Sequence, residues 1–513
     1  MTPARAGINP WLVAMVVSLA TFMEVLDTTI TNVSISHIAG SLGATTDEST
    51  WVLTSYLVAN GIILPLSGWL AGAMGRKNFF LACIAGFTAA SFACGASTSL
   101  AMLIMFRLIQ GAAGGGLQPT QQAIILDSFP PAKRGAVFAI TGVTMIVAPI
   151  LGPTLGGWIT DNFSWRWIFY INIPVGIAAF IMVTRWVEDP PHAQAKASSG
   201  VDYWGLGMIG LGLGALQIML DKGQQEDWFD SNFILAMTVL AAVCLVAAVR
   251  RLWNQPDPLV DLHLLANRQF AMSCILIFMT GFVLYGGSVL LPLILQSQYG
   301  YDALLAGLVL SPSGLAVMFL MPVVGKLIGK FPARNLVVLG LLLTGSGMAV
   351  TAHITPQTDY NTFVIMRFFQ VLGLPFLFIP ISTLAFQHIA KEKSSKASAL
   401  FSMFRNLGGS FGIAIAIAHL ARRQQFHQTV LSANLSPTSS VLQQGLEHGT
   451  RVTGSLAGAQ QHLYGELLRQ ASILSYADTF VLMAALMGIA AIAAMLLLPY
   501  TTPGASDGAM AAH

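Results

Sequence analysis

The sequence predicts an all-α membrane protein with fourteen transmembrane helices, and three observations support this prediction. Of the 513 residues, 55% are hydrophobic and only 9% are charged, whereas about 25% are charged in a soluble domain. The mean hydropathy is +0.69. Apolar runs long enough to cross a bilayer, which takes about 20 residues, recur along the chain. This composition excludes a water-soluble enzyme and a disordered chain, and the net charge of +3 gives no support for nucleic-acid binding.

The apolar runs and the loops between them place the helices in order. We expect them at 11–36, 51–72, 78–97, 101–126, 135–159, 166–187, 203–221, 232–250, 269–296, 303–325, 335–354, 362–388, 397–420 and 475–498. The first run is too long for a secretory signal peptide and carries Glu24 and Asp27 in its apolar core, so we expect it to be retained as a helix.

The Lys and Arg residues predict the orientation of these helices. If the N-terminus lies in the cytoplasm, most of the 25 cations fall in segments on that side. The short loops on the opposite side then hold only Arg166 and Lys222. Cytoplasmic loops of membrane proteins carry such an excess of positive charge. Both ends of the chain are therefore predicted to be cytoplasmic.

An internal repeat predicts two related halves. The stretch MFRLIQGAAGG contains Arg107 and Gln110, and the stretch MRFFQVLGLPF contains Arg367 and Gln370, each 260 residues later. Transporters built from such repeats bind substrates and ions near the midplane of the membrane, between the repeats.

The repeat and two polar segments divide the chain into three parts. We expect an N-terminal six-helix bundle over 1–187, a linker with two inserted helices over 188–268, and a C-terminal six-helix bundle over 269–513. The last part contains a polar outside loop, 421–474, which has room for a helix or two.

The segment 11–36 carries the strongest chemical signal. At 100° per residue, its polar side chains fall on one face of a helix. These are Thr21, Glu24, Asp27, Thr28, Thr31 and Ser34. A carboxylate inside the membrane is costly and indicates function. Two neighbouring carboxylates raise each other's proton affinity, which suits a proton carrier. The alternative is that both only hydrogen-bond to other helices.

Arg107 is a second in-membrane charge, within the apolar run 101–126. Its guanidinium stays charged and needs a carboxylate or carbonyl partner. It either favours proton release from a neighbouring carboxyl group or clamps its helix to the first one. Arg367 and Arg405 resemble it but fit a structural role better.

Two stretches have the residues of moving interfaces. In the helix 135–159, prolines bend the backbone and glycines allow another helix to approach closely. The stretch GWLAGAMGRK ends in a tight basic turn, which is either a gate contact or a simple topology signal. The conformational residues that we assign are Pro149, Gly152, Pro153, Gly156, Gly157, Gly68, Gly75 and Arg76.

Other chemical motifs are missing from the sequence. No GK pair is followed by Ser or Thr, so no phosphate-binding P-loop is present, and no HExxH occurs. The four cysteines lie in apolar stretches without metal-binding spacing. We therefore expect no enzyme activity, no metal and no cofactor, and an ion gradient as the source of energy.

Several motifs resemble the major facilitator superfamily, specifically its fourteen-helix drug:proton antiporters of the EmrB type. LDTTITNVSI (26–35) is similar to the signature with the coupling acid, here Asp27, and LIMFRLIQGAAGG (103–115) to the motif with the essential arginine, here Arg107. APILGPTLGG (148–157) is similar to the exporter-specific antiporter motif. The stretch 68–77 departs from the family pattern, because Gly72 stands where an Asp is usual.

The resemblance implies a proton-driven exporter of hydrophobic or amphipathic toxic compounds in the bacterial inner membrane, working by alternating access. Such pumps join a periplasmic membrane-fusion adaptor and an outer-membrane channel, and the loop 421–474 suits an adaptor contact. Proton coupling falls to Asp27, Glu24 and Arg107. We expect the substrate cavity to be lined by Tyr56, Asn60, Gln110, Gln118, Gln121, Tyr285, Phe369 and Gln370.

Two alternatives remain at this point. A narrow-substrate symporter is disfavoured by the antiporter motif at 148–157. A transport-inactive membrane sensor is disfavoured by the in-membrane acids, which would be costly without a function.

Overall fold

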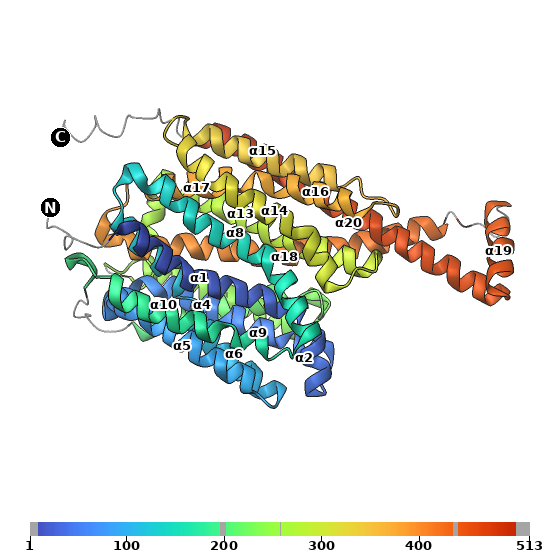
Figure 1. The fold of residues 1–513 in the computed structure, drawn as a ribbon, viewed down its shortest axis with the longest axis horizontal. Helices are drawn as coiled ribbons and strands as arrows, with labels where there is room; N and C mark the ends of the chain where they lie inside the picture. The colour runs from blue at the N-terminus through green and yellow to red at the C-terminus, as the bar shows by residue number, and fades with distance from the viewer. Residues whose placement is uncertain (1–8, 195–201, 257, 434, 436–439, 499–513) are drawn as a thin grey trace.

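The computed structural model describes residues 9–194, 202–256, 258–433, 435 and 440–498. All regular elements in this part of the chain are helices (Figure 1). Thirteen of them are long and apolar enough to cross a membrane, and a bent pair, Lys133–Pro149 with Leu151–Asn162, makes up to 14 if it is one span. This agrees with the fourteen helices predicted.

The N-terminal half contains six spans and two short helices between the first and second. Its helices are α1 (Pro10–Val33), α2 (Ile35–Leu42), α3 (Thr46–Ser49), α4 (Trp51–Met74), α5 (Arg76–Ala96), α6 (Leu100–Gly114), α7 (Leu117–Ser128), α8 (Pro131–Asn162), α9 (Trp167–Tyr170) and α10 (Asn172–Trp186). The span predicted at 101–126 is divided into α6 and α7 at Gly115 and Gly116, and Asn60 of α4 packs against this break.

Two inserted spans follow the linker. They are α11 (Tyr203–Lys222) and α12 (Asn232–Trp253), with the short 3-10 helices η1 (Pro191–Ala193), η2 (Trp228–Asp230) and η3 (Leu262–Ala266) around them. Asp202 begins α11 by accepting a hydrogen bond from the Gly205 backbone at 3.0 Å, and Arg251 at the end of α12 donates to the same carboxylate at 2.8 Å. The hydrogen bond from Arg251 holds the pKa of Asp202 well below its ordinary value. The predicted linker residues 195–201 lie outside the described part.

The C-terminal half repeats the arrangement of the first. Its helices are α13 (Arg268–Gln298), α14 (Ala303–Leu327), α15 (Ala333–Thr351), α16 (Tyr360–Leu372), α17 (Leu374–Ala385), η4 (Lys391–Lys393), α18 (Ser394–Ala433), α19 (Ser440–Thr453) and α20 (Leu456–Leu497). The span predicted at 362–388 is broken at Gly373, where α16 and α17 meet, as α6 and α7 meet in the first half.

The polar segment 421–474 is largely helical rather than a loop. The helix α18 continues to Ala433, and α20 begins at Leu456, well before the apolar part of its sequence. With α19 they form the projection at one end of the molecule in Figure 1. A helix or two was expected in this segment, and α19 and the first turns of α20 lie there. The extension of α18 to Ala433 was not expected, because a helix outside the membrane needs no apolar surface on every side.

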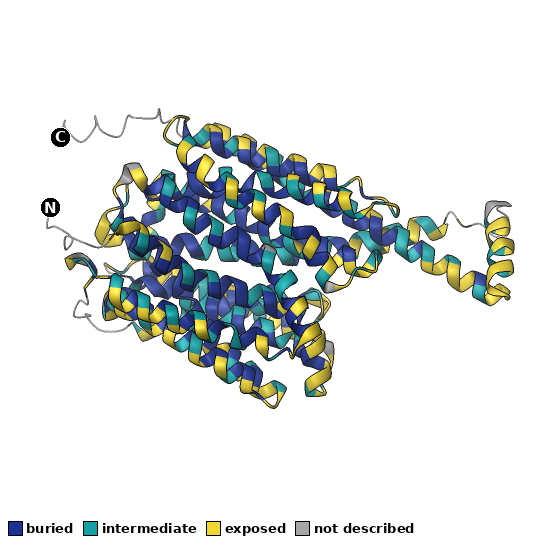
Figure 2. Cartoon of the chain, viewed as in Figure 1, coloured by how far each residue is buried: buried dark blue, intermediate teal, exposed yellow. Residues whose placement is uncertain are grey.

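The two halves meet along a few helices. Within the first half α1 packs on α8 and α10, and α4 packs on α6; within the second, α13 packs on α18, and α15 on α20. Between the halves, α8 lies against α14, and α18 lies against α4 and α7. Buried residues concentrate along these contacts (Figure 2).

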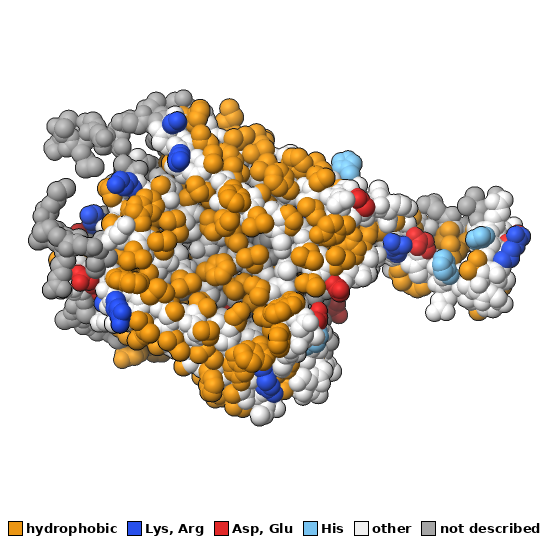
Figure 3. All heavy atoms as spheres, viewed as in Figure 1, with side chains coloured by type: hydrophobic (Ala, Val, Ile, Leu, Met, Phe, Trp, Pro, Cys, Tyr) orange, Lys and Arg blue, Asp and Glu red, His pale blue; other side chains and the backbone are white. Residues whose placement is uncertain are grey.

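The surface fits a membrane environment. On the face shown in Figure 3, hydrophobic side chains cover the helical body, while Lys and Arg gather near the end at which α1 begins and α20 finishes. We call this the terminal end, and the end that carries α19 the far end.

Candidate functional site

Asp27 and Arg107 form a buried ion pair within the N-terminal half. Arg107 Nη1 lies 2.6 Å from Asp27 Oδ2, and both residues are 1% exposed. Gly111, one turn after Arg107, lies directly on the Tyr56 carbonyl, so α6 packs tightly on α4. The Arg107 guanidinium also stacks on the ring of Tyr56, with 4.2 Å between Cζ and the ring centroid. The positive charge of Arg107 is therefore compensated inside the protein by the Asp27 carboxylate and the Tyr56 ring.

Amide side chains complete the coordination of this pair. Asn172 Nδ2 donates to Asp27 Oδ1 at 2.6 Å, and Gln110 Nε2 donates to the same oxygen at 3.1 Å. Gln110 Oε1 in turn accepts from Arg107 Nη1 at 2.8 Å. A buried ion pair is tolerated only when its remaining polar atoms are satisfied in this way.

Glu24 lies one turn before Asp27 on α1, but it has different partners. Its carboxylate accepts hydrogen bonds from Tyr56 Oη at 3.2 Å, Asn60 Nδ2 at 3.3 Å and Gln118 Nε2 at 2.6 Å. The side chain is 3% exposed. No cation lies within ion-pair distance of it among the described residues. All three donors are neutral, so this group can be held either charged or protonated.

A cavity of about 390 Å³ lies between the halves, and Glu24 forms part of its wall. The exposure of the lining residues falls from Asn32 and Gln225, which are exposed, to Glu24 and Leu64, which are buried. The exposed pair belongs to the far half of the molecule, and Leu64 lies deeper, toward the terminal end of α4. The cavity therefore has its mouth at the far end. Its wall is mainly apolar, with a few polar groups, as in sites for small organic molecules.

The C-terminal half contacts the Glu24 site directly. Arg405 of α18 donates a hydrogen bond to Gln118 Oε1, and the same amide donates to Glu24. Asn406 Nδ2 donates to Asn60 Oδ1 at 3.3 Å, and Asn60 also donates to Glu24. The state of the Glu24 carboxyl group is thus connected to the interface between the halves by two short paths.

Helix α8 is bent and packs tightly against both halves. Its two parts meet at 42° beside Pro149. Gly152 lies on Thr29 of α1, and a Cβ at Gly156 would lie 2.6 Å from Val33. On the other side, Thr154 forms a 3.0 Å hydrogen bond with Ser311 of α14. Movement of one half relative to the other must therefore change the contacts of α8.

The turn between α4 and α5 closes the terminal end of the interface. Arg76 donates to Asp127 of α7 and, at 3.1 Å each, to the hydroxyl groups of Ser394 and Ser395 at the start of α18. A Cβ at Gly68 would lie 2.7 Å from Lys396 Cα, so the backbones of the two halves are in direct contact here. The usual family acid is absent at Gly72, and Asp127 supplies the carboxylate instead.

The chain is similar in sequence to known membrane transporters. The family model described as Major Facilitator Superfamily matches residues 17–413. The chain belongs to the major facilitator superfamily. It is 39% identical over 429 residues to the multidrug export protein EmrB of Escherichia coli, covering 83% of each chain. It is 38% identical over 448 residues to the fatty acid resistance protein FarB of Neisseria gonorrhoeae, covering 87% of each.

Solved structures agree on the major-facilitator fold. The superposition with the proton:xylose symporter XylE covers 96% of this chain and 97% of the XylE chain, with a TM-score of 0.60 at 14% identity. The human organic anion transporter MFSD10 has the same TM-score and identity and covers 94% of this chain. Two six-helix bundles with two inserted helices are therefore the architecture of this major-facilitator protein.

The predicted cavity residues of this major-facilitator protein divide into two groups. Tyr56, Asn60, Gln118 and Tyr285 line the cavity. The prediction was wrong for the other four, which do not line the cavity. Gln110 belongs to the Asp27 site, and Gln121 donates to Ser18 at 2.8 Å. Gln370 donates to Thr351 at 2.8 Å, and Phe369 is 43% exposed on the outer surface. Phe369 and Gln370 are adjacent in sequence and so point to different sides of their helix.

Sequence reasoning missed several residues of the site. Asn172 begins α10 and reaches Asp27, while Asn406 reaches the Glu24 site from α18. Arg405, for which the sequence favoured a structural role, also reaches that site. Gln217 and Asp221 of the inserted helix α11 line the cavity. Each is a polar residue inside an apolar run, and this signal alone marks candidates for a site within a membrane.

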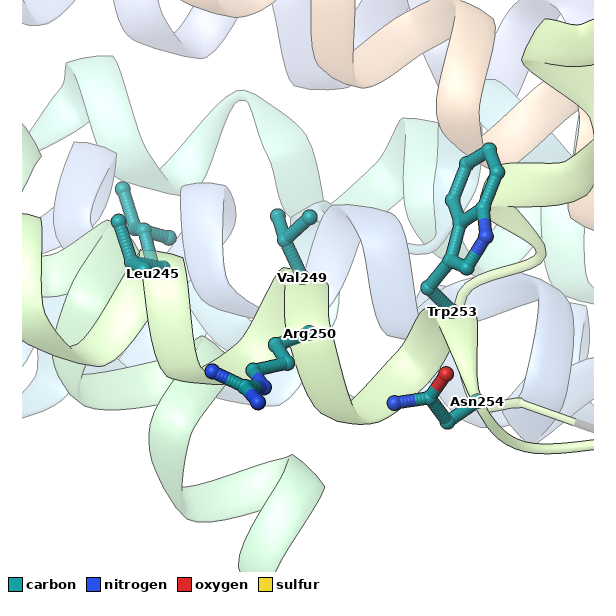
Figure 4. A pocket seen from close by; sticks show the side chains of 6 residues that line it. Leu245, Val249, Arg250, Trp253 and Asn254 are labelled. Carbon is teal, nitrogen blue, oxygen red and sulfur yellow. The ribbon is translucent and has the colours of Figure 1, made fainter.

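A second hollow of about 470 Å³ lies on the outer side of α12. Figure 4 shows Leu245, Val249 and Trp253 in a row on the helix, with Arg250 and Asn254 beside them. A Trp and an Arg at the end of a span are typical of the membrane interface. The hollow holds no carboxylate, and no group of three or more His, Cys, Asp or Glu suited to a metal occurs in the described residues.

Proposed function

We propose that this protein is a proton-coupled antiporter that exports hydrophobic or amphipathic toxic compounds. Relatives at 38–39% identity are named for multidrug export and for fatty acid resistance. A further relative at 30% identity, from Acinetobacter baumannii, is named for colistin resistance. A mainly apolar cavity of about 390 Å³ suits varied compounds of this kind.

The placement of Glu24 is the observation that carries the proposal. Its carboxyl group borders the cavity, so substrate and solvent reach it, and it is held by three neutral donors. Asp27 lies behind it, paired with Arg107. A proton on Glu24 and a substrate in the cavity then compete for one site. Binding of one favours release of the other, which is the condition for exchange.

The arrangement of the halves supports alternating access. The cavity has its mouth at the far end, while contacts of Arg76 and Gly68 with the start of α18 close the terminal end. The structure therefore represents the state that is open at the far end. In the opposite state these contacts must break, and α8, packed on both halves, must shift with them.

The charge distribution supports the predicted orientation. Lys and Arg gather near the terminal end on the face in Figure 3. Because cytoplasmic segments are rich in these residues, the terminal end faces the cytoplasm of a bacterium and the far end faces the periplasm. The cavity then releases its substrate outward.

The far projection supports a tripartite assembly. Together α18, α19 and α20 extend beyond the membrane-spanning body (Figure 1). This projection offers a helical surface to a periplasmic membrane-fusion adaptor, which would connect the pump to an outer-membrane channel.

Transport in inside-out membrane vesicles tests the proposal. With an imposed proton gradient, we expect the wild type to accumulate a lipophilic dye. We expect Asp27→Asn and Glu24→Gln to reduce gradient-driven uptake about tenfold or more, because an amide at either position cannot take up and release a proton; a tenfold change corresponds to about 1.4 kcal/mol. Glu226→Gln, an exposed acid outside the cavity, is the matched control. Uptake by both variants at the wild-type rate would contradict proton coupling at this site.

A further inference from the structure

The inserted helix α11 forms part of the cavity wall. Leu213, Gln217, Leu220 and Asp221 of this helix line the cavity. The helix packs against α4 of the first half and against α18 of the second. An inserted helix that served only as a spacer would not need polar side chains on the inner face of a substrate cavity.

Polar contacts fix α11 to both halves at this wall. Thr54 of α4 donates its hydroxyl to the Asp221 carboxylate. One turn earlier on α11, Gln217 Oε1 accepts from Ser410 Oγ of α18 at 3.0 Å. Because residues four apart lie on the same face of a helix, Asp221 and Gln217 form one polar strip.

This strip continues to the Glu24 site. Ser410 Oγ also contacts the Asn406 carbonyl at 3.2 Å, and Asn406 is hydrogen-bonded to Asn60, which donates to Glu24. A row of polar groups thus runs along the cavity from Asp221 near the mouth to Glu24 at the floor. Between these two carboxyl groups the wall carries no other carboxyl among the described residues.

The charges at the wall favour a positively charged molecule. The charged residues that line the cavity are Glu24, Arg107 and Asp221. Arg107 is neutralised by Asp27 behind the wall. Lys222, next to Asp221, directs its ammonium group to Thr50 and to Gln225 at 2.9 Å, and over the ring of Trp51 at 5.0 Å. The acids in the lining are therefore Glu24 and Asp221, and the cation nearest to Glu24 behind the wall is Arg405, which donates to Gln118. At the mouth, Asp221 is left as the carboxylate that faces the cavity.

We propose that Asp221, supported by Gln217, is a substrate-recognition residue that selects amphipathic organic cations. The apolar part of such a molecule contacts the aliphatic wall, and its positive charge lies near the Asp221 carboxylate at the mouth. The inserted helices are then part of the specificity site, and an outward-moving substrate meets Asp221 after it leaves Glu24. This inference rests on the proposed export function.

Equilibrium binding to two ions of equal shape and opposite charge tests this inference. The probes are tetraphenylphosphonium and tetraphenylborate, measured on the purified full chain in nanodiscs, with empty nanodiscs subtracted. We expect the wild type to bind the cation more tightly. We expect Asp221→Asn to weaken cation binding roughly tenfold and to leave anion binding unchanged or tighter, since one charge pair is lost.

Two variants make the result specific. Asp230→Asn removes the same charge from the exposed η2 segment outside the cavity and should bind as the wild type does. Asp221→Glu keeps the charge and should restore the preference for the cation. Equal binding of both ions by the wild type, or an equal loss of both in Asp221→Asn, would overturn the inference. Failure of proton coupling would show separately, as vesicle transport that ignores the gradient while this binding persists.

Discussion

The two halves of the molecule contain the same arginine site, but only one has a carboxylate. In the first half, Arg107 donates to Gln110 at 2.8 Å, and Gln110 donates to Ser91 at 2.7 Å. In the second half, Arg367 donates to Gln370 at 3.0 Å, and Gln370 donates to Thr351 at 2.8 Å. All three pairs of residues are separated by 260 positions in the sequence.

The difference lies at a single position on the first helix of each half. The residue 260 positions after Asp27 is Gly287 on α13. A Cβ at Gly287 would lie 4.0 Å from Arg367 Nη1, so this glycine occupies the place of the acid. Arg367 is 2% exposed. Besides Gln370, its hydrogen-bond partner among the described residues is Ser288 at 3.3 Å, and its Nε has none there. The two halves share the helical framework, and the acid occurs at this position in the first half only.

This comparison teaches where proton chemistry can take place. A buried arginine with amide and hydroxyl partners is sufficient to hold two helices together, as Arg367 shows. The additional carboxyl groups, Asp27 and Glu24, are not needed for that packing. Their presence in the first half alone therefore indicates a function beyond structure.

Removal of each arginine should produce the largest contrast. Arg107→Ala leaves Asp27 buried without its cation, and we expect a loss of about 3–5 kcal/mol of stability together with loss of transport. Arg367→Ala leaves no carboxylate behind and should cost clearly less. Thermal unfolding of the purified variants in detergent, with dye transport in vesicles, measures both.

A double variant tests the reason for this contrast. Arg107→Ala combined with Asp27→Asn should recover part of the lost stability, because the uncompensated charge is removed as well. Equal destabilisation by Arg107→Ala and Arg367→Ala would break the comparison.

The two glutamines should differ in the same direction but less. Gln110→Leu removes a donor from Asp27 and an acceptor from Arg107, so we expect a cost of about 1–3 kcal/mol and reduced gradient-driven uptake. Gln370→Leu removes contacts with Arg367 and Thr351 only, and transport should be retained. A stronger transport defect in Gln370→Leu than in Gln110→Leu would contradict the placement of proton coupling in the first half.

Much of this organisation can be read from the sequence. The fourteen spans follow from apolar runs, and Asp27, Glu24 and Arg107 stand out as charges inside them. The repeat of Arg107 and Gln110 as Arg367 and Gln370 can be recognised by comparing the two sequence motifs. Gly287 does not stand out, because the first helices of the two halves share no motif. The offset of 260 residues leads to this position, and the fold shows that it lies beside Arg367.

Contacts between distant segments explain the other gaps. The link from Arg405 to Gln118 joins residues 287 positions apart, and no local pattern encodes it. Helix α11 forms part of the cavity wall but lies outside the internal repeat, so the repeat gave no reason to expect Asp221 there. The span predicted at 101–126 is divided into α6 and α7, and its side chains face different neighbours: Gln110 contacts Asp27, and Gln121 contacts Ser18.

Restoring the acid in the second half is the finest test of the comparison. In Gly287→Asp, the new Cβ would lie 2.9 Å from Met348 Cε, the flexible end of a side chain that can move aside. The carboxylate would then reach Arg367 and satisfy it, so we expect the stability to change by less than about 1 kcal/mol in either direction, with gain from pairing offset by desolvation. The matched Gly287→Asn keeps the size without the charge and should be less stable than Gly287→Asp. Because Glu24 and Asp27 are untouched, gradient-driven dye uptake should persist in both variants. If Gly287→Asp instead unfolds at a much lower temperature than Gly287→Asn, Arg367 does not face this position as Arg107 faces Asp27, and the two sites are not equivalent.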